Sequence, residues 1–272
     1  MLKAGVIGYP VKHSLSPKLH SYWLRQLRIE GEYVAKEVKP EDLLNTIKTL
    51  SESGFIGVNL TIPHKKHAIP MLDEIDDVAR DIGAVNTIVV KSGKLIGSNT
   101  DAYGFSENIR PHLSKKRSKA VVLGAGGAAP AVIYALRNEQ FEKIIVLNRT
   151  EEKSHEIANL FGGLVEVAAW DKRSTILEGA DLLVNTTSLG MAGKEPLDID
   201  LSALPKHALV TDIIYTPLIT PLLAAAKARG KPVVDGLGML IYQAVPGFEA
   251  WFGKKPEVTP QSLEQLKQML LS

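Results

Sequence analysis

The chain has 272 residues and no cysteine, and its 32 Lys and Arg against 30 Asp and Glu give a net charge of +2 at pH 7. Disulfides, thiolate catalysis and cysteine-bound metals are therefore excluded, and the balanced charge does not indicate a nucleic-acid-binding face. The N-terminus lacks the features of a signal peptide, and no stretch approaches the roughly 18 apolar residues of a membrane span. We therefore expect a soluble, cytoplasmic protein that binds neither nucleic acid nor membranes.

Strand-like and helix-like patterns alternate through the first hundred residues. We predict strands over 3–10, 31–38 and 55–62, helices over 16–29 and 39–54, short helical pieces over 63–73 and 73–83, and a β-hairpin over 84–101. Ser16 and Pro17 are expected to open the first helix as its N-cap and first helical residue, and the hairpin is expected to turn at Ser92-Gly93. The alternation predicts an α/β domain with a mainly parallel sheet.

A second pattern begins near Lys115. The segments "AVVLGAGGAAPAVIYAL" and "KIIVLNRT" predict a strand, a glycine turn, a helix and a second strand, and further buried strands are predicted within 180–191, 208–215 and 232–239. Residues 239–272 are helical by pattern. We expect a first domain made of residues 1–101 and 238–272, a Rossmann-type dinucleotide-binding domain over 102–237, and an active site in the cleft between them.

The glycine turn "LGAGGAA" directly follows a hydrophobic strand and starts a helix, with Ala129 at the third position of the dinucleotide-binding pattern. One glycine of such a turn allows the tight bend, and another lets the backbone approach a pyrophosphate at the helix N-terminus. The strand–turn–helix context therefore predicts a dinucleotide site here.

The tip of the following strand indicates which dinucleotide is bound. An NAD-binding unit usually places Asp or Glu there to bind the adenosine ribose. This chain has Asn148-Arg149-Thr150 instead, with Lys153 one turn further on. Cationic and hydroxyl donors suit a ribose 2′-phosphate, so we expect the cofactor to be NADP. No grouping of His, Asp and Glu has metal-ligand spacing, and we expect no metal.

Small polar residues gather at the ends of the predicted elements of the first domain. Hydroxyl and amide groups in such a set are suited to binding a polyhydroxylated small molecule, because a site built from them rejects analogues that lack the matching hydroxyl. The set comprises Ser14, Ser16, Asn59, Thr61, Asn86, Thr87, Asn99, Thr100 and Asp101.

Eight motifs together resemble those of the shikimate dehydrogenase family, whose members are NADPH-dependent reductases of 3-dehydroshikimate. The motifs stand in the family's order and cover almost the whole chain: "GYPVKHSLSP", "GVNLTIPHK", "GAVNT", "GSNTDAYGF", "VLGAGGAA", "NRT", "NTTSLGM" and "DGLGML". The resemblance implies an α/β substrate domain joined to a Rossmann-type domain. It also implies reversible reduction of 3-dehydroshikimate to shikimate in aromatic amino acid biosynthesis.

The resemblance also implies the roles of individual residues. Lys65 is the catalytic lysine and pairs with Asp101, whereas Lys66 and His67 are expected to face solvent. The substrate-binding residues are Ser14, Ser16, Asn59, Thr61, Asn86, Tyr215 and Gln243. The cofactor-binding residues are Asp77, Gly124, Ala125, Gly126, Gly127, Ala128, Asn148, Arg149, Thr150, Lys153, Ile213 and Gly236.

Two positions depart from the family pattern, and two alternative functions stay open. Pro130 stands where many relatives carry another residue, often Arg, which could weaken a phosphate contact, and Ile213 replaces a Met found in some relatives. The first alternative function is a quinate/shikimate dehydrogenase that uses NAD. The second is a non-catalytic sensor of shikimate-type ligands, which would be expected to lack Lys65 or Asp101. We expect a monomer or a homodimer.

Overall fold

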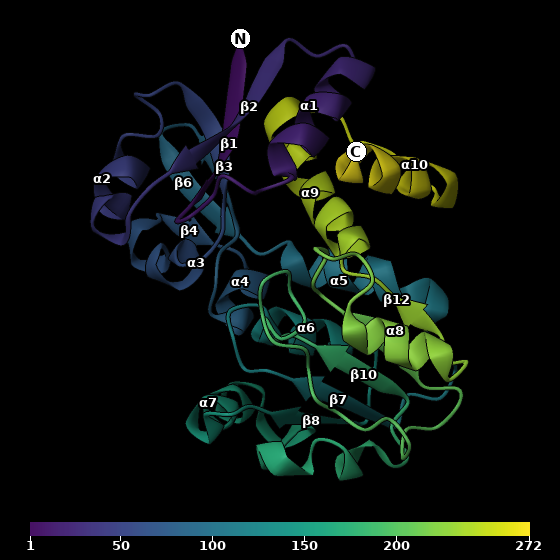
Figure 1. Cartoon of the computed structure of the whole chain (residues 1–272). Helices are drawn as coiled ribbons and strands as arrows, with labels where there is room; N and C mark the ends of the chain where they lie inside the picture. The colour runs from purple at the N-terminus through teal and green to yellow at the C-terminus, as the bar shows by residue number, and fades with distance from the viewer. The chain divides into compact units, whose positions relative to one another are not determined.

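The computed structural model describes residues 1–272 and divides the chain into two compact units (Figure 1). The first unit consists of Met1–Gly104 and Leu240–Ser272, and the second consists of Phe105–Met239. The predicted domain boundaries, after residue 101 and before residue 238, lie two or three residues from this division. None of the helices is long and apolar enough to cross a membrane.

The first unit contains a six-stranded sheet in the order β2-β1-β3-β5-β6-β4. Its strands are β1 (Leu2–Gly8), β2 (Gly31–Glu37), β3 (Phe55–Leu60), β4 (Glu74–Ile75), β5 (Thr87–Lys91) and β6 (Lys94–Ser98). Three of the five pairings are parallel, and β5 is antiparallel to both of its neighbours. The antiparallel part follows from the predicted hairpin, whose Ser92 and Gly93 both have positive φ, as a tight two-residue turn requires.

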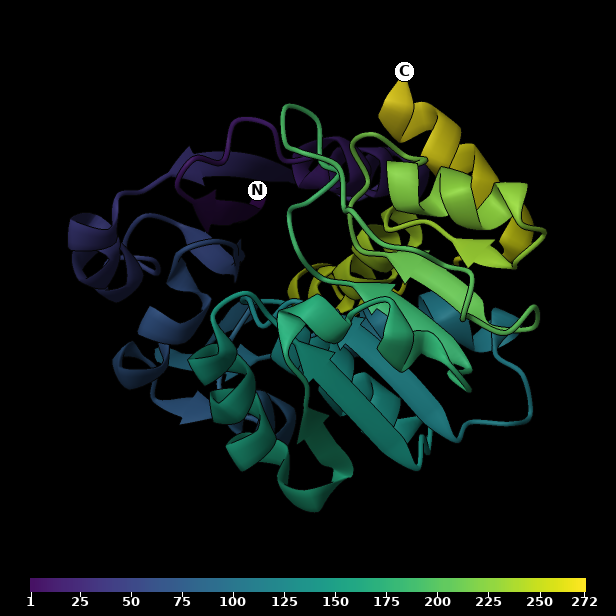
Figure 2. The same ribbon diagram turned by 60° about the horizontal axis from the view of Figure 1, so that its bottom comes forward.

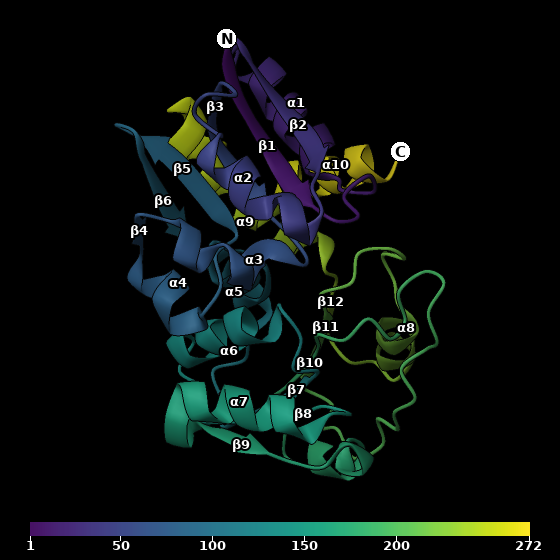
Figure 3. The ribbon, with the colours of Figure 1, turned by 90° about the vertical axis from the view of Figure 1, so that its left-hand side faces the viewer.

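Helices cover both faces of this sheet (Figures 1 and 3). One face carries α2 and α3, and the other carries α1 and α9. The helices of the unit are α1 (Ser16–Gln26), α2 (Leu43–Lys48), α3 (His64–His67), α4 (Asp77–Ile82), α9 (Leu237–Phe252) and α10 (Pro260–Leu271), with short 3₁₀ turns at Pro40–Asp42 and Ile69–Met71. The predicted helical piece over 73–83 was partly wrong, because Glu74–Ile75 forms an edge strand against β6.

The start of α1 differs from the prediction in one detail. Ser16 is the first helical residue rather than the N-cap, and the N-cap position is Leu15. The cap-like hydrogen bond is made one residue earlier, where the Ser16 backbone N–H donates to Ser14 Oγ at 3.3 Å. The two serines are thereby held next to each other at the helix start.

Aromatic rings pack together between α1, β2 and α9. The His20 ring is fully buried and lies parallel to the Tyr33 ring, with centroids 3.9 Å apart, and the rings of Trp23, Phe248 and Trp251 surround it at 5.7–5.8 Å. Neither ring nitrogen of His20 has a hydrogen-bond partner. Burial therefore lowers the pKa of His20 from 6.5 to about 3, and the ring is neutral in the folded protein.

This buried histidine makes the first unit sensitive to acid. Below pH 6.5 the unfolded chain binds a proton on His20 that the folded chain does not bind until about pH 3. The contribution of this group to the free energy of unfolding is therefore fully present above pH 6.5 and falls as the pH drops below that value. The slope from this one group is roughly 1 kcal/mol per pH unit. We expect His20→Phe to flatten the decline of the urea unfolding midpoint between about pH 6.5 and about pH 5. The variant His67→Gln, at an exposed histidine, should keep the wild-type slope; equal slopes for both variants would contradict the prediction.

The second unit is built on a six-stranded, wholly parallel sheet in the order β12-β11-β10-β7-β8-β9, which Figure 2 shows from below. Its strands are β7 (Lys119–Leu123), β8 (Lys143–Leu147), β9 (Val165–Val167), β10 (Leu182–Asn185), β11 (Leu209–Asp212) and β12 (Val233–Val234). The inner strands are buried on both faces, which explains their continuous apolar runs. The chain order reverses between β7 and β10, where doubly wound sheets bind their ligands.

Helices flank this sheet on both sides, with α6 and α7 on one face and α8 on the other (Figure 3). The helices and 3₁₀ turns are α5 (Asp101–Ile109), whose first four residues belong to the first unit, and then η3 (Arg110–His112), α6 (Ala129–Asn138), α7 (Glu151–Phe161), η4 (Gly162–Leu164), η5 (Trp170–Lys172), η6 (Thr175–Leu177) and α8 (Pro221–Ala228). Pro130 lies in the first turn of α6. The backbone N–H groups of a first turn have no partner within the helix, so a proline there costs no helical hydrogen bond. The Rossmann-type fold that the glycine turn predicted is confirmed.

Candidate active site

Lys65 and Asp101 form a close ion pair in the first unit. The Lys65 Nζ lies 2.5 Å from Asp101 Oδ2, and the two side chains are 20% and 8% exposed. Lys65 sits on α3, directly after β3, and its backbone carbonyl accepts a hydrogen bond from Val85 N at 2.8 Å. The short helix is therefore tied to the segment that leads into Asn86, which brings the lysine to the polar side chains there.

The neighbours of Lys65 on α3 have other surroundings. Lys66 and His67 are exposed, as predicted. His64 is buried, and its Nε2 lies 2.8 Å from the carbonyl oxygen of Val38, to which it donates as the neutral tautomer. Burial lowers the pKa of His64, which agrees with that neutral form. Of the four basic residues on this helix, only Lys65 joins the ion pair.

Asn86 is the centre of the hydrogen bonds around this ion pair. Its Oδ1 accepts from Thr100 N at 2.8 Å, which fixes the orientation of the amide because a backbone N–H can only donate. Its Nδ2 then donates to Asp101 Oδ1 at 2.8 Å. It also lies 3.0 Å from Thr100 Oγ1 and 3.3 Å from Gln243 Oε1. Gln243 is oriented in turn by donating Nε2 to the carbonyl of Leu240 at 2.9 Å.

Asn59 extends the same network along β3. Its Nδ2 donates to the carbonyl of Asn86 and to Thr87 Oγ1, both at 3.0 Å. Thr87 Oγ1 in turn donates to Asn86 Oδ1 at 3.0 Å. We call Asn59, Lys65, Asn86, Thr87, Thr100, Asp101 and Gln243 the polar cluster. All seven lie in the first unit, and each touches at least one other member.

Thr61 lies two residues after Asn59 of the polar cluster, whereas Ser14 and Ser16 come from another segment of the first unit. Thr61 directly follows β3, and its backbone N–H donates to Ile7 O at 2.9 Å, so it lies where β1 and β3 end side by side. Ser14 and Ser16 stand where β1 connects to α1. The serine and threonine hydroxyls are uncharged, so Lys65 and Asp101 are the charged pair among these candidate residues.

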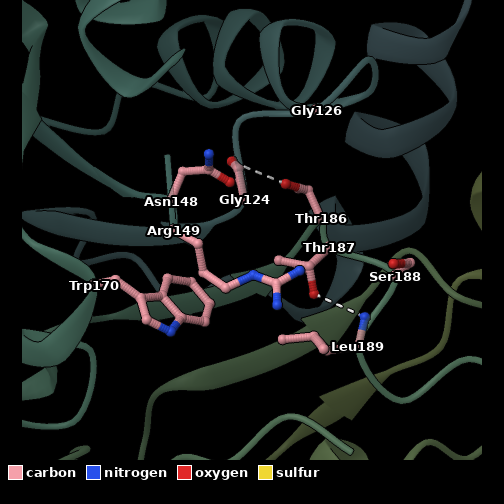
Figure 4. Close-up of a pocket in the computed structure, with 9 residues that line it drawn as sticks. All are labelled: Gly124, Gly126, Asn148, Arg149, Trp170, Thr186, Thr187, Ser188 and Leu189. Atoms are coloured by element: carbon pink, nitrogen blue, oxygen red, sulfur yellow. Dashed lines mark hydrogen bonds between the residues drawn. The ribbon is translucent and has the colours of Figure 1, made fainter. Parts of the chain in front are cut away.

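The second unit has a cavity at the carboxyl ends of its central strands (Figure 4). It is lined by Gly124, Gly126, Asn148, Arg149, Trp170 and the segment Thr186–Leu189. Gly124 has a φ of +104°, and a Cβ there would lie 2.7 Å from Thr186 Oγ1, so only glycine fits. A Cβ at Gly126 or Gly127 would meet nothing within 4 Å, so the space over the turn is open for a ligand.

The side chains at this cavity fit a dinucleotide with a 2′-phosphate. Asn148 Oδ1 accepts from Ala125 N at 3.2 Å and so joins the strand tip to the glycine turn. Arg149 is exposed and reaches across the opening beside Trp170 (Figure 4), and Thr150 and Lys153 are exposed next to it. None of the cavity-lining residues is a carboxylate, which would repel a phosphate.

Ile213, Tyr215 and Gly236 belong to the second unit and lie at the carboxyl ends of β11 and β12. A Cβ at Gly236 would lie 2.4 Å from the carbonyl of Ile213, so this glycine allows the two segments to touch. Asp212 holds the Ile213 segment from inside, accepting from Ile214 N at 3.0 Å and from Thr220 Oγ1 at 2.8 Å. Burial raises the pKa of Asp212, which has no cation beside it.

The sequence matches three family profiles in succession. Residues 6–88 match the profile described as the shikimate dehydrogenase substrate binding domain, residues 107–213 the profile of shikimate / quinate 5-dehydrogenase, and residues 236–260 the C-terminal domain of shikimate 5'-dehydrogenase. The chain is also 51% identical to a shikimate dehydrogenase (NADP(+)) of Paramagnetospirillum magneticum, covering 99% of this chain and 98% of that protein. This chain belongs to the shikimate dehydrogenase family.

Solved structures of the family have the same fold. A shikimate 5-dehydrogenase of Thermus thermophilus in complex with NADP(H) and shikimate is 38% identical, with a TM-score of 0.88 over 99% of this chain and 100% of that one. A quinate dehydrogenase of Corynebacterium glutamicum in complex with NAD is 29% identical, with a TM-score of 0.91 over 99% of this chain and 98% of that one. Backbone similarity alone therefore does not separate the two specificities within the family.

The structure groups most of the predicted site residues within single units. Lys65, Asp101, Asn59, Asn86 and Gln243 share one hydrogen-bond network, whereas Tyr215 lies in the second unit. Asp77 lies on α4 of the first unit with a side chain that is 92% exposed, where it pairs with Arg80. Its assignment to the cofactor stays a prediction.

Two residues at these sites were not predicted from the sequence. Tyr33 was predicted only as part of a strand, yet its hydroxyl donates to Asn59 Oδ1 at 2.6 Å. A tyrosine in a buried strand needs a hydrogen-bond partner, and this rule could have directed attention to it. Trp170 lines the cavity of the second unit from a 3₁₀ turn, where nothing in the local pattern indicates a ligand.

Proposed function

We propose that this protein catalyses the reversible NADPH-dependent reduction of 3-dehydroshikimate to shikimate, a step of aromatic amino acid biosynthesis. The observation that carries the proposal is the Lys65–Asp101 ion pair at 2.5 Å, embedded in uncharged hydroxyl and amide groups. Family membership supports the same activity. A cytoplasmic location and a monomeric or homodimeric state stay predictions.

Lys65 is the proton donor and acceptor of this reaction. When a ketone is reduced, negative charge develops on its oxygen, and the Lys65 ammonium stabilises that charge and delivers the proton. In the reverse direction the neutral amine takes the proton of the alcohol. Asp101 holds Nζ through Oδ2, while Asn86 holds the other carboxylate oxygen at 2.8 Å, so the ion pair is oriented from both sides.

The remaining residues of the first unit bind the substrate in this proposal. Ser14 and Ser16 bind the carboxylate, and the hydroxyl groups are bound by Asn59, Thr61, Asn86, Asp101 and Gln243, with Tyr215 of the second unit completing the set. The polar cluster supports this assignment because its amides are oriented by backbone groups, so their donors and acceptors are arranged before the substrate binds.

The second unit binds NADP in this proposal. NADPH supplies the hydride when it is bound. The glycine turn from Gly124 to Ala128 lies against the pyrophosphate, and the 2′-phosphate is bound by Arg149, Thr150 and Lys153, with Asn148 holding the turn. Ile213 and Gly236 of the same unit are also assigned to the cofactor, and the resemblance to the family adds Asp77 of the first unit. The open space over Gly126 and the exposed guanidinium of Arg149 support this assignment.

The test is an absorbance assay at the nicotinamide band that pairs shikimate and quinate with NADP and NAD in all four combinations. We expect the highest kcat/KM with shikimate and NADP. Activity with quinate and NAD alone would show that the protein is the alternative dehydrogenase. The similarity to a quinate dehydrogenase solved with NAD makes this the main alternative to test. Binding of shikimate without turnover in any combination would favour the sensor, although both Lys65 and Asp101 are present.

A further inference from the structure

Tyr33 is hydrogen-bonded to Asn59, one of the proposed substrate-binding residues. It lies on β2, where its side chain is buried, and its hydroxyl donates to Asn59 Oδ1 at 2.6 Å. Burial raises the pKa of Tyr33 well above 10. The phenol therefore keeps its proton near neutral pH and can act as a donor.

The direction of the Tyr33 hydrogen bond is fixed by Asn59. The Asn59 amide nitrogen faces the backbone carbonyl of Asn86, which can only accept, so Nδ2 must lie on that side. The amide oxygen must then face Tyr33, and the Tyr33 O–H must donate. No other assignment of the Asn59 amide satisfies both neighbours.

The Tyr33 ring is itself held in place by the aromatic residues around it. The His20 ring lies parallel to it at 3.9 Å, with an angle of 1° between the two planes, and the Trp251 ring lies 5.9 Å away. Trp251 is anchored by its indole N–H, which donates to Ile88 O at 3.0 Å. The position of the hydroxyl is therefore set by packing and does not depend on a bound substrate.

These contacts use nearly all of the hydrogen-bonding capacity of Asn59. Both amide protons are donated, to Asn86 O and Thr87 Oγ1, and one lone pair of Oδ1 accepts from Tyr33. One lone pair of Oδ1 is left. Resting on the proposed function, we propose that Tyr33 is a positioning residue that locks the Asn59 amide so that its Oδ1 meets a shikimate hydroxyl as an acceptor.

The test compares Tyr33→Phe, which removes only the hydroxyl, with Tyr22→Phe, a tyrosine on the same unit outside the cluster. Shikimate binding is measured by calorimetry, and KM by assay. We expect Tyr33→Phe to weaken shikimate binding about three- to tenfold, to raise KM for shikimate equally, and to leave KM for NADP unchanged. Tyr22→Phe should match wild type in all three.

A double-mutant cycle shows whether Tyr33 acts through Asn59. In the Asn59→Ala background, Tyr33→Phe should have no further effect on the shikimate Kd, because the group that it orients is gone. The double variant removes both partners of the buried Tyr33–Asn59 hydrogen bond, so neither group is left unpaired. It can therefore be compared with Asn59→Ala even if Tyr33→Phe alone does not fold. An unchanged Kd in Tyr33→Phe, or a further loss in the double variant, overturns the inference. Binding of shikimate by a wild-type protein that shows no turnover would contradict only the proposed function, since the calorimetric cycle still decides the role of Tyr33.

Discussion

The variant Lys65→Met is expected to lower kcat by about two to four orders of magnitude, the usual contribution of a positioned general acid. Methionine keeps the unbranched apolar stem of lysine, one atom shorter, but has no proton to give. Binding of shikimate should change little, because Asn86 still holds the Asp101 carboxylate at 2.8 Å and the other amides keep their backbone partners. The measurements are kcat from initial rates with shikimate and NADP, and the shikimate Kd from calorimetry.

The adjacent lysine provides the matched control. Lys66 lies on the same short helix but is exposed, so Lys66→Met makes the same chemical change without touching the polar cluster. It should keep kcat close to that of wild type. Near-wild-type turnover in Lys65→Met, or equal losses of turnover in both variants, would show that Lys65 is not the residue that transfers the proton.

The elements with the strongest local patterns could be predicted from the sequence. The wholly parallel sheet of the second unit follows from continuous apolar runs separated by helical patterns, and Gly124 marks the turn because no other residue fits there. The hairpin at Ser92-Gly93 was also predictable, since Gly93 is the residue type that the positive φ at the end of a two-residue loop favours. These features depend on sequence neighbours alone.

The features that were missed depend on contacts distant in sequence. The edge strand Glu74–Ile75 is too short to show a period, and it forms only because β6 offers a free edge. Tyr33 lies 26 positions from Asn59, and its role becomes visible only when β2, β1 and β3 lie in one sheet. In the same way, Asn86 and Gln243 meet across 157 positions, which no spacing rule connects.

The hydrogen-bond network also changes how the first-domain polar residues are understood. From the sequence they form a set of separate hydroxyls and amides, each of which could turn toward a ligand. In the structure, backbone groups at Thr100, Asn86 and Leu240 orient the three amides. The specificity of such a site comes from this fixed polarity, because a ligand hydroxyl in the wrong position leaves a buried group unpaired.

Cofactor choice is expected to depend on Arg149 more than on any other side chain. A charge-assisted hydrogen bond to a phosphate contributes about 1.5–3 kcal/mol, which corresponds to roughly ten- to a hundredfold in affinity. Arg149→Ala should therefore raise KM for NADP by about that factor. KM for NAD should change little, because NAD has no 2′-phosphate for the guanidinium to bind.

The control for this variant is Arg229→Ala, which removes an exposed arginine that follows α8 of the same unit and does not line the cavity. It should leave both KM values at the wild-type level. The decisive quantity is the ratio of kcat/KM for NADP to that for NAD, measured at one salt concentration because screening weakens phosphate contacts. A ratio that stays the same in Arg149→Ala would place 2′-phosphate recognition on Thr150 and Lys153 instead, since these exposed donors stand beside Arg149 at the start of α7.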